Sequence, residues 1–193
     1  RLGGRAIYWG RVGDDQTGDE VLWLLTHEGI DVSGVRRLAG FRTKIASILI
    51  DSRGERLAVS AQPQGYPPDA SWLPVDRVAE ANAVLADTRW PNGAQRLFEA
   101  AATARLPSVF DGDGGEPEQV AATARQCTHP FFSQPMLASF GYGSPERSLP
   151  RVFGGRNVVS GVTLGAAGVM WFDGDRLHTM PSPHVQAVDT LAA

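Results

Sequence analysis

The pattern of apolar residues changes its period repeatedly from residue 83 onward, and this alternation constrains the fold more than any other feature of the chain. Short apolar runs typical of β-strands are separated by stretches with the apolar spacing of α-helices. Strands that are separated by single helices pair in parallel, with helices packed against the sheet. We therefore expect an α/β fold with a mostly parallel central sheet and helices on both faces. The expected strands are 83–86, 108–110, 131–132 and 157–164, the expected helices are 92–104, 116–125 and a stretch near Leu149, and 169–172 and 176–180 form a final hairpin.

The first sixty residues follow a different pattern. An apolar strand at 6–9 is followed by a helix at 17–28 with Gly29 after it. Two strand-like stretches then follow, 43–51 and 56–61, and the short turn between them is typical of a hairpin. Because this hairpin interrupts the alternation of strand and helix, we expect it to project from the main sheet.

Composition excludes several classes of protein. With 193 residues, of which 42% are hydrophobic, the chain can build the core of one domain. The net charge of −3 gives no electrostatic attraction for nucleic acid or an anionic membrane. No apolar run approaches the roughly 20 residues that a membrane-spanning helix needs. The single cysteine, Cys127, cannot form an internal disulfide and is expected in the core. These features predict a cytoplasmic protein without nucleic-acid or membrane partners.

Polar and glycine-rich clusters follow the predicted strands, at the point where each strand ends. In open α/β sheets, ligands bind beyond the carboxyl ends of the parallel strands. Each cluster alone is equally consistent with cap or turn residues. Together at one edge of a sheet, they predict a site for a polar small molecule. The clusters are Asp87-Thr88-Arg89-Trp90, Asp111-Gly112-Asp113-Gly114-Gly115, Gly165-Ala166-Ala167-Gly168 and Asp189-Thr190.

Several charged residues are individual candidates for ligand binding. Arg89 follows a predicted strand, where its guanidinium could hold an anionic group or pair with a nearby acid. The doublet Asp14-Asp15, between Gly13 and Gly18, could bind a metal ion or sugar hydroxyls, or serve only as acids favoured at a helix start. Lys44 is either solvated or points at a ligand beneath the hairpin. The four histidines share no metal-like spacing, so the sequence predicts no metal site.

Longer strings of the sequence resemble the ribokinase/PfkB family of sugar kinases. The string "GRVGDDQTGDEVLWLLTHEGIDVSGV" is similar to the N-terminal signature of the family, "VTLGAAGVMW" to its nucleotide-loop strand, and "VQAVDT" to the start of its D-T-x-G-A-G-D motif. The strings "VLADTRW", "VFDGD" and "FFSQPML" further resemble the sulfofructose kinase branch, which phosphorylates 6-deoxy-6-sulfofructose at its primary 1-hydroxyl. The order and spacing agree over essentially the whole chain.

The resemblance implies a ribokinase-like three-layer α/β/α fold, with the hairpin of about 40–62 as a small β-lid over a sugar. It implies ATP and Mg²⁺, and in-line phosphoryl transfer with an Asp general base and an anion hole of backbone N–H groups. Arg89 would face the distal end of the sugar, where a sulfonate or phosphate needs a cation. The implied substrate-binding residues are Arg89, Lys44, Ser60 and Asp14, the implied nucleotide-binding residues are Thr163, Gly165 and Gly168, and Asp189 and Thr190 are expected at the entry of the anion hole.

The sequence departs from the family pattern at several positions. Ala192 stands at the first Gly position of the final motif, and the catalytic Asp would lie beyond Ala193. We therefore expect residues 1–193 to be a partial kinase domain that is truncated at both ends. Gln134 stands where the sulfofructose kinase branch carries an acid, and Ser60 where it carries an Asn. These two differences leave the handling of the metal and the choice of sugar open.

The sequence is consistent with three interpretations of the function. The first is an ATP-dependent ketose kinase, of which this chain is the central part. The second is a non-catalytic fragment or a sugar- or nucleotide-binding module, because the general base is missing. The third is a nucleoside-type kinase of the same superfamily. The hairpin would expose an edge and an apolar face if left alone, so we also expect a homodimer through the β-lid.

Overall fold

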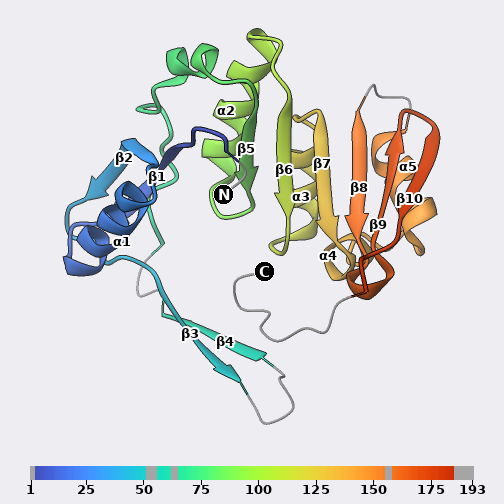
Figure 1. Ribbon diagram of the computed structural model, residues 1–193, viewed down its shortest axis with the longest axis horizontal. Helices are drawn as coiled ribbons and strands as arrows, with labels where there is room; N and C mark the ends of the chain where they lie inside the picture. Colours follow the sequence, from blue (N-terminus) through green and yellow to red (C-terminus); the bar gives the residue numbers. More distant parts are fainter. Residues whose placement is uncertain (1–2, 51–55, 62–64, 155–157, 185–193) are drawn as a thin grey trace. The chain divides into compact units, whose positions relative to one another are not determined.

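The computed structural model describes residues 3–50, 56–61, 65–154 and 158–184. The chain divides into two compact units, residues 1–67 and residues 68–193. In Figure 1 the first unit runs from blue to cyan and the second from green to red. Within the described part of the chain, no helix has the length and apolar character needed to cross a membrane.

The first unit contains a strand–helix–strand motif. β1 (Ile7–Gly13) and β2 (Asp31–Leu38) pair in parallel, and α1 (Gln16–His27) connects them. Asp15 is the N-cap of α1, because its side chain accepts a hydrogen bond from the backbone N–H of Gly18 at 2.8 Å. The predicted helix is therefore present, and its start is fixed by an acid.

Both strands of this motif differ from the prediction. The apolar pattern predicts only residues 6–9 of β1 and no strand at β2. Glycines in both strands account for the difference, because close neighbours occupy the space of the missing side chains. A Cβ on Gly13 would lie 2.4 Å from the backbone nitrogen of Thr43, and a Cβ on Gly34 would lie 2.2 Å from the ring of Trp9. Such glycines weaken the strand signal of the sequence.

The predicted hairpin forms a two-stranded antiparallel sheet of its own. β3 (Ile45–Ile50) pairs with β4 (Arg56–Ala61), in a register that runs from Ile45 opposite Ala61 to Ile50 opposite Arg56. All six residues of β3 are exposed. The exposed large apolar residues of the hairpin are Ile45, Ile48, Leu49, Ile50, Leu57 and Val59.

The second unit contains a six-stranded sheet in the order β10-β9-β8-β7-β6-β5. The strands from β5 to β8 are parallel, whereas β9 and β10 are antiparallel to their neighbours. This arrangement confirms the prediction of an α/β fold with a mostly parallel sheet. The strands are β5 (Val84–Asp87), β6 (Ser108–Gly112), β7 (His129–Ser133), β8 (Val159–Thr163), β9 (Val169–Asp173) and β10 (Arg176–Met180), and the helices are α2 (Pro91–Thr103), α3 (Pro117–Ala124), α4 (Gln134–Ala138) and α5 (Pro145–Phe153). Two short 3₁₀ helices, η1 (Val75–Glu80) and η2 (Gly165–Ala167), complete the unit.

Helices α2 to α5 all pack against one face of this sheet and enclose its core (Figure 1), so the predicted helices on the second face are not found among the described residues of this unit. Phe98 of α2 and Leu149 of α5 are buried against Phe110, Phe132 and other residues of the strands. The ring of Phe132 stacks on that of Phe153, with ring centroids 5.8 Å apart. Cys127 is buried in the same cluster, as expected for a small core residue.

The opposite face of the sheet also carries apolar side chains. The register of the strands places Leu85, Val109, Phe131 and Trp171 on this face. Leu85 is 64% exposed, and the other three are half-buried. The sheet therefore has one closely packed face and one face whose apolar residues retain contact with solvent.

Candidate functional site

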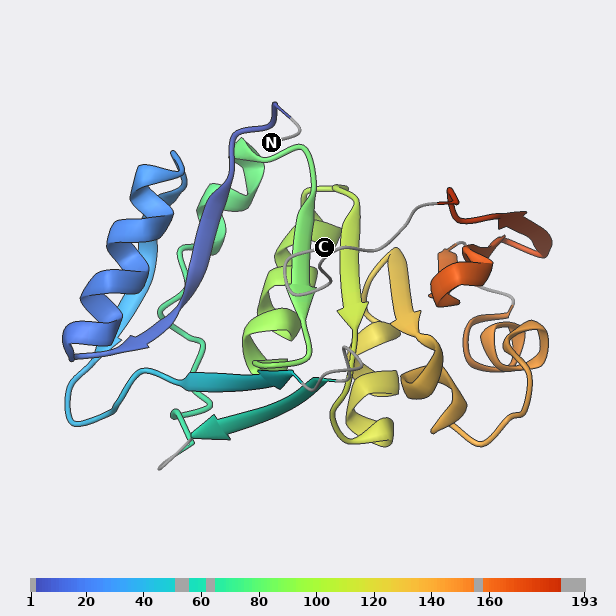
Figure 2. The same ribbon diagram turned by 60° about the horizontal axis from the view of Figure 1, so that its bottom comes forward.

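The carboxyl ends of β5 and β6 bring two acids together at one edge of the sheet. Asp87 and Asp111 are the last paired residues of these two parallel strands, which point the same way in Figure 2. Burial raises the pKa of Asp111, the negative charges of Asp113 and Asp87 raise it further, and the positive charge of Arg89 acts in the opposite direction. These four charged groups therefore share one electrostatic environment at the edge where open α/β sheets bind their ligands.

Arg89 lies in a turn that Asp87 closes. The Asp87 carboxylate accepts a hydrogen bond from the backbone N–H of Arg89 at 2.8 Å, which confirms the turn role considered for this acid. Arg89 is exposed, and among residues with described positions no carboxylate lies within ion-pair distance of its guanidinium. Within the described residues, Arg89 therefore does not form the surface ion pair that the sequence offered as its second possible role.

Two tryptophans hold this turn in place. The rings of Trp72 and Trp90 stack at 5.4 Å, and the indole N–H of Trp90 donates to the carbonyl of Pro68 at 3.1 Å. Gly93, in the first turn of α2, is buried beneath the indole, because a Cβ there would lie 2.5 Å from the Trp90 ring. Sequence reasoning singled out Trp90 only as a neighbour of Arg89 and did not identify Trp72 or Gly93. The signal available was a glycine in the first turn of a helix, three residues after a tryptophan.

The residues that the sequence assigns to nucleotide binding occupy one turn between β8 and β9. Thr163 ends β8, and its hydroxyl donates to the carbonyl of Phe132 at 3.4 Å. The backbone N–H of Leu164 donates to the carbonyl of Gly168 at 2.8 Å, which closes the turn. Gly165 and Gly168 both have positive φ, 58° and 98°.

The two glycines of this turn differ in their surroundings. A Cβ on Gly168 would lie 2.1 Å from the carbonyl oxygen of Met180, so the backbone packing alone requires a glycine there. A Cβ on Gly165 would meet no atom of the described residues within 4 Å. The backbone of Gly165 is therefore open to a ligand, whereas Gly168 has a structural reason to be a glycine.

The predicted residues of the first unit are held by their own neighbours. Asp14 forms an ion pair with Arg37 of β2 at 2.9 Å, and Arg37 also pairs with Asp19. The ammonium of Lys44 lies 5.3 Å from the centre of the Tyr66 ring, in a cation–π contact. Ser60 lies in β4 opposite Ala46 and is exposed. The helix-start role considered for the doublet Asp14-Asp15 is confirmed for Asp15, the N-cap of α1, whereas a contact of Asp14 with a ligand stays a prediction.

Asp15 and Thr43 form a connection that the sequence did not reveal. The Asp15 carboxylate accepts hydrogen bonds from the Thr43 hydroxyl at 2.6 Å and from the Thr43 backbone N–H at 2.8 Å. The Thr43 hydroxyl oxygen also accepts from the backbone N–H of Gly13 at 2.9 Å. This connection joins the start of α1 to the segment that leads into the hairpin. The two residues are 28 positions apart in the sequence, so no local pattern could have predicted this connection.

The profile of the pfkB family carbohydrate kinases matches residues 1–193, the whole length of the sequence. The chain belongs to the pfkB family of carbohydrate kinases.

Relatives and solved structures agree with this assignment. A fructokinase of Klebsiella pneumoniae is 39% identical over 90 residues, covering 41% of this chain and 29% of the relative. Fructokinase-1 of Oryza sativa subsp. japonica is 41% identical over 56 residues, covering 29% of this chain and 17% of the relative. A crystal structure of an Agrobacterium tumefaciens protein, provisionally called a ribokinase, superposes with a TM-score of 0.85 at 35% identity, over 100% of this chain.

A second solved structure supports the fold alone. Arabidopsis thaliana ribokinase, solved in complex with ribose and ATP, has a TM-score of 0.76 and 18% identity over 97% of this chain. This chain spans 64% of both solved chains and a smaller share of the curated relatives. The predicted ribokinase-like fold is therefore shown.

Mg²⁺ is the metal ion that the sequence resemblance implies. Within the described ranges, no three or more His, Cys, Asp and Glu side chains are grouped so that they could hold a metal ion. In phosphoryl-transfer sites Mg²⁺ is bound by one or two carboxylates together with the substrate phosphates, so such a group is not required. Gln134, where the sequence predicts an effect on the handling of the metal, is the first residue of α4. Asp189 and Thr190 lie outside the described residues.

Proposed function

We propose that the protein carrying this chain is an ATP-dependent kinase that phosphorylates a primary hydroxyl of a ketose. Family membership supports a carbohydrate substrate, and the K. pneumoniae and O. sativa relatives are fructokinases. The observation that carries the proposal is Arg89, a cation without a carboxylate partner in the described chain, next to Asp87 and Asp111 at the carboxyl edge of the sheet. An arrangement of two acids and one cation suits a polyhydroxylated molecule that also bears an anionic group.

In this proposal each group of residues has a distinct task. The carboxylates of Asp87 and Asp111 accept hydrogen bonds from sugar hydroxyls, and the guanidinium of Arg89 binds a sulfonate or phosphate at the distal end of the sugar. The open backbone of Gly165 and the hydroxyl of Thr163 face the nucleotide. Lys44, Ser60 and Asp14 remain predicted contacts of the sugar from the first unit. The specific candidate for the substrate is an anionic ketose, 6-deoxy-6-sulfofructose, which would be phosphorylated at O1.

The remaining parts of the reaction follow from general chemistry. ATP provides the phosphoryl group, and Mg²⁺, when bound, neutralises the charge of its phosphates. Asp189 and Thr190 are proposed to begin the anion hole that stabilises the transferred group, and the general base is proposed to follow Ala193 in the full protein. We place this reaction in the cytoplasm. If the base is absent, binding of sugar or nucleotide without transfer is the expected behaviour of residues 1–193.

Substituting Arg89 tests the proposal. In the protein that carries this chain, Arg89→Ala should lower kcat/KM for an anionic ketose by about 30- to 150-fold, because a charge-assisted hydrogen bond is worth roughly 2–3 kcal/mol. The loss for neutral fructose should stay within about threefold. The assay measures ATP-dependent phosphorylation of fructose, fructose 6-phosphate and 6-deoxy-6-sulfofructose.

Arg125→Ala is the matched control, because Arg125 is an exposed arginine at the end of α3. It should leave kcat/KM unchanged for every sugar. Equal losses for neutral and anionic sugars in Arg89→Ala would contradict the role of Arg89, and the absence of phosphorylation of every sugar by the full protein would contradict the kinase proposal.

The partner proposed for the hairpin is a second copy of the chain. Leu49 and Leu57 lie opposite each other on one face of the hairpin and are 59% and 60% exposed, while Ile48 on the other face is 48% exposed. An antiparallel pair of strands with apolar residues on both faces is marginally stable in water by itself. Packing against the same hairpin of a second copy would cover one face by symmetry.

A further inference from the structure

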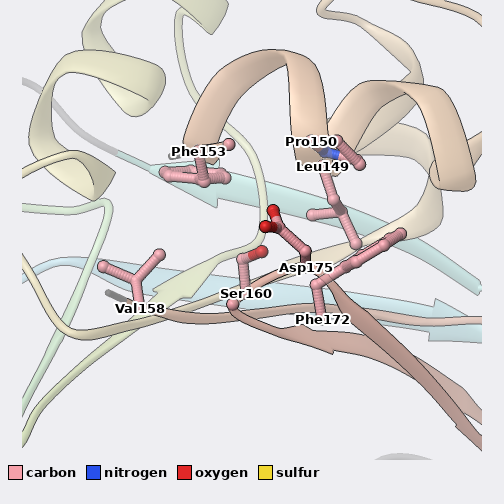
Figure 3. Close-up of a pocket in the computed structure, with 9 residues that line it drawn as sticks. Leu149, Pro150, Phe153, Val158, Ser160, Phe172 and Asp175 are labelled. Atoms are coloured by element: carbon pink, nitrogen blue, oxygen red, sulfur yellow. The ribbon is translucent and has the colours of Figure 1, made fainter. Parts of the chain in front are cut away.

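A cavity of about 120 Å³ lies in the second unit between α5 and the strands β8 and β9 (Figure 3). It is lined by residues at the end of α5, by Val158 and Ser160 at the start of β8, and by Asp175 in the turn between β9 and β10. Thr163 and the turn that it precedes stand at the other end of β8. The cavity is therefore separate from the carboxyl edge to which the kinase proposal refers, and its function does not depend on that proposal.

The walls of the cavity combine apolar side chains with polar atoms. Leu149 and Phe153 of α5 line one side, and Phe172 of β9 lines the other (Figure 3). Leu149 is fully buried and Phe153 is 2% exposed, so both side chains are fixed by the core. An engineered, wholly apolar protein cavity of about 150 Å³ binds benzene, so the apolar side of a space of about 120 Å³ can hold a hydrocarbon group of about four carbons.

Two polar groups point into this cavity. Figure 3 shows the hydroxyl of Ser160 and the carboxylate of Asp175 directed towards the same part of the cavity. Ser160 is only 2% exposed, and over the residues that the structure describes its hydroxyl forms no hydrogen bond. The hydroxyl oxygen remains accessible from the cavity, so it is available to a ligand that enters.

The charge around these two groups favours a cation. Within the same described ranges, Asp175 forms no ion pair. Helix α5 ends at Phe153 beside the cavity, and the carbonyl end of a helix carries partial negative charge. Arg151, in the last turn of α5, has its guanidinium over the ring of Tyr142 at 5.8 Å.

We propose that this cavity binds small primary alkylammonium ions. The ammonium group donates hydrogen bonds to the Asp175 carboxylate and to the Ser160 hydroxyl oxygen, and the alkyl chain lies against Phe153 and Phe172. A carboxylate, a helix carbonyl end and a buried hydroxyl recognise the charged end, while the size of the cavity limits the chain to about four carbons.

Titration with n-butylammonium tests this site directly. An amine of this type is charged at pH 7, and n-butanol and butyrate are the neutral and the anionic molecules of matching length. Two-dimensional ¹H–¹⁵N NMR of the protein should show saturable shifts at the amides of Ser160 and Gly174. The Kd for n-butylammonium should be at least about tenfold lower than the Kd for n-butanol, and butyrate should cause no shift.

Single variants measure the separate contributions of the two polar groups to binding. Asp175→Asn should raise the Kd for n-butylammonium about tenfold or more without changing the Kd for n-butanol, and Ser160→Ala should raise the Kd for n-butylammonium severalfold. Asp173→Asn is the matched control, since Asp173 is an exposed acid of the same hairpin that does not line the cavity. Equal affinity for the ammonium ion and the alcohol, an equal effect of Asp173→Asn and Asp175→Asn, or the absence of saturable shifts would overturn the proposal.

Discussion

The carboxylate of Asp15 joins three segments of the first unit. It caps α1 through Gly18 and accepts both the hydroxyl and the backbone N–H of Thr43, whose hydroxyl oxygen accepts the N–H of Gly13. The hydrogen bond from the Thr43 hydroxyl, followed by those from the two backbone N–H groups, holds the pKa of Asp15 below its usual value of 3.8. One acid therefore fixes the start of the helix, the end of β1 and the approach to the hairpin.

This pairing predicts a pH dependence of stability. Because the pKa is lower in the folded state, the charged form of Asp15 stabilises the fold above about pH 3.8, and this stabilisation is lost as the pH falls towards the folded pKa. Thr43→Val should raise the folded pKa of Asp15 towards 3.8. It should also lower the free energy of unfolding at pH 7 by about 1–3 kcal/mol, since the buried N–H of Gly13 loses its acceptor.

NMR titration of the Asp15 carboxyl carbon and urea denaturation at pH 7 and pH 3 measure these effects. Thr26→Val is the control, because the Thr26 hydroxyl donates only to the Leu22 carbonyl within α1. An unchanged Asp15 pKa in Thr43→Val would show that the Thr43 hydroxyl is not the main cause of the lowered pKa.

Among the elements of the fold, the hairpin of β3 and β4 stands out because its apolar side chains are exposed. Its alternating apolar residues form strands as the sequence predicts, yet the same residues are about half exposed or more. Apolar strands that remain exposed are a source of unwanted association unless a partner covers them. The proposed dimer resolves this conflict.

Leu57→Lys tests the proposed dimer. A charge placed opposite Leu49 would have to be buried in the interface, so the dimer dissociation constant should rise by about tenfold or more. Sedimentation equilibrium of the wild type and the variant measures this change. Leu24→Lys is the matched control, because Leu24 of α1 is also an exposed leucine, with 51% of its surface accessible. A wild-type protein that is monomeric throughout the concentration range would refute the dimer.

Elements were predictable where short-range patterns determine them. The switch between strand and helix periods is local, so β5 to β10 and helices α2, α3 and α5 follow from it, as does the pairing of Asp87 with Asp111 at a common edge. β2 was missed because Gly34 accommodates the ring of Trp9, which is a contact between distant segments. The stacking of Trp72 on Trp90 and the bonding of Asp15 to Thr43 were missed for the same reason.

Across the second unit as a whole, the two faces of the six-stranded sheet differ in packing. Phe132 lies on the helix-covered face and is 2% exposed, with aromatic contacts to Phe140 and Phe153. Leu85 lies on the other face and is 64% exposed. The stability of this unit should therefore depend mainly on the face that the helices cover.

Paired truncations compare the two faces. In the 193-residue chain, Phe132→Ala should lower the free energy of unfolding by about 3–5 kcal/mol, because it removes a buried ring and leaves a cavity. Leu85→Ala should lower it by less than about 1 kcal/mol, because its side chain is mostly in water already. Urea denaturation followed by circular dichroism measures both values. Similar losses for the two variants would show that the exposed face contributes as much as the core.

The strands of this sheet lie side by side in the order in which they occur in the chain, from β5 to β10. During synthesis the N-terminal strands leave the ribosome first, so each new strand meets a neighbour that has already been made. The connections between neighbouring strands contain a turn, one helix or, between β7 and β8, two helices, so each pairing joins segments that are close in sequence and the entropic cost of each step stays small. The second unit can therefore assemble by growth from one edge, with β10 as the last strand to join.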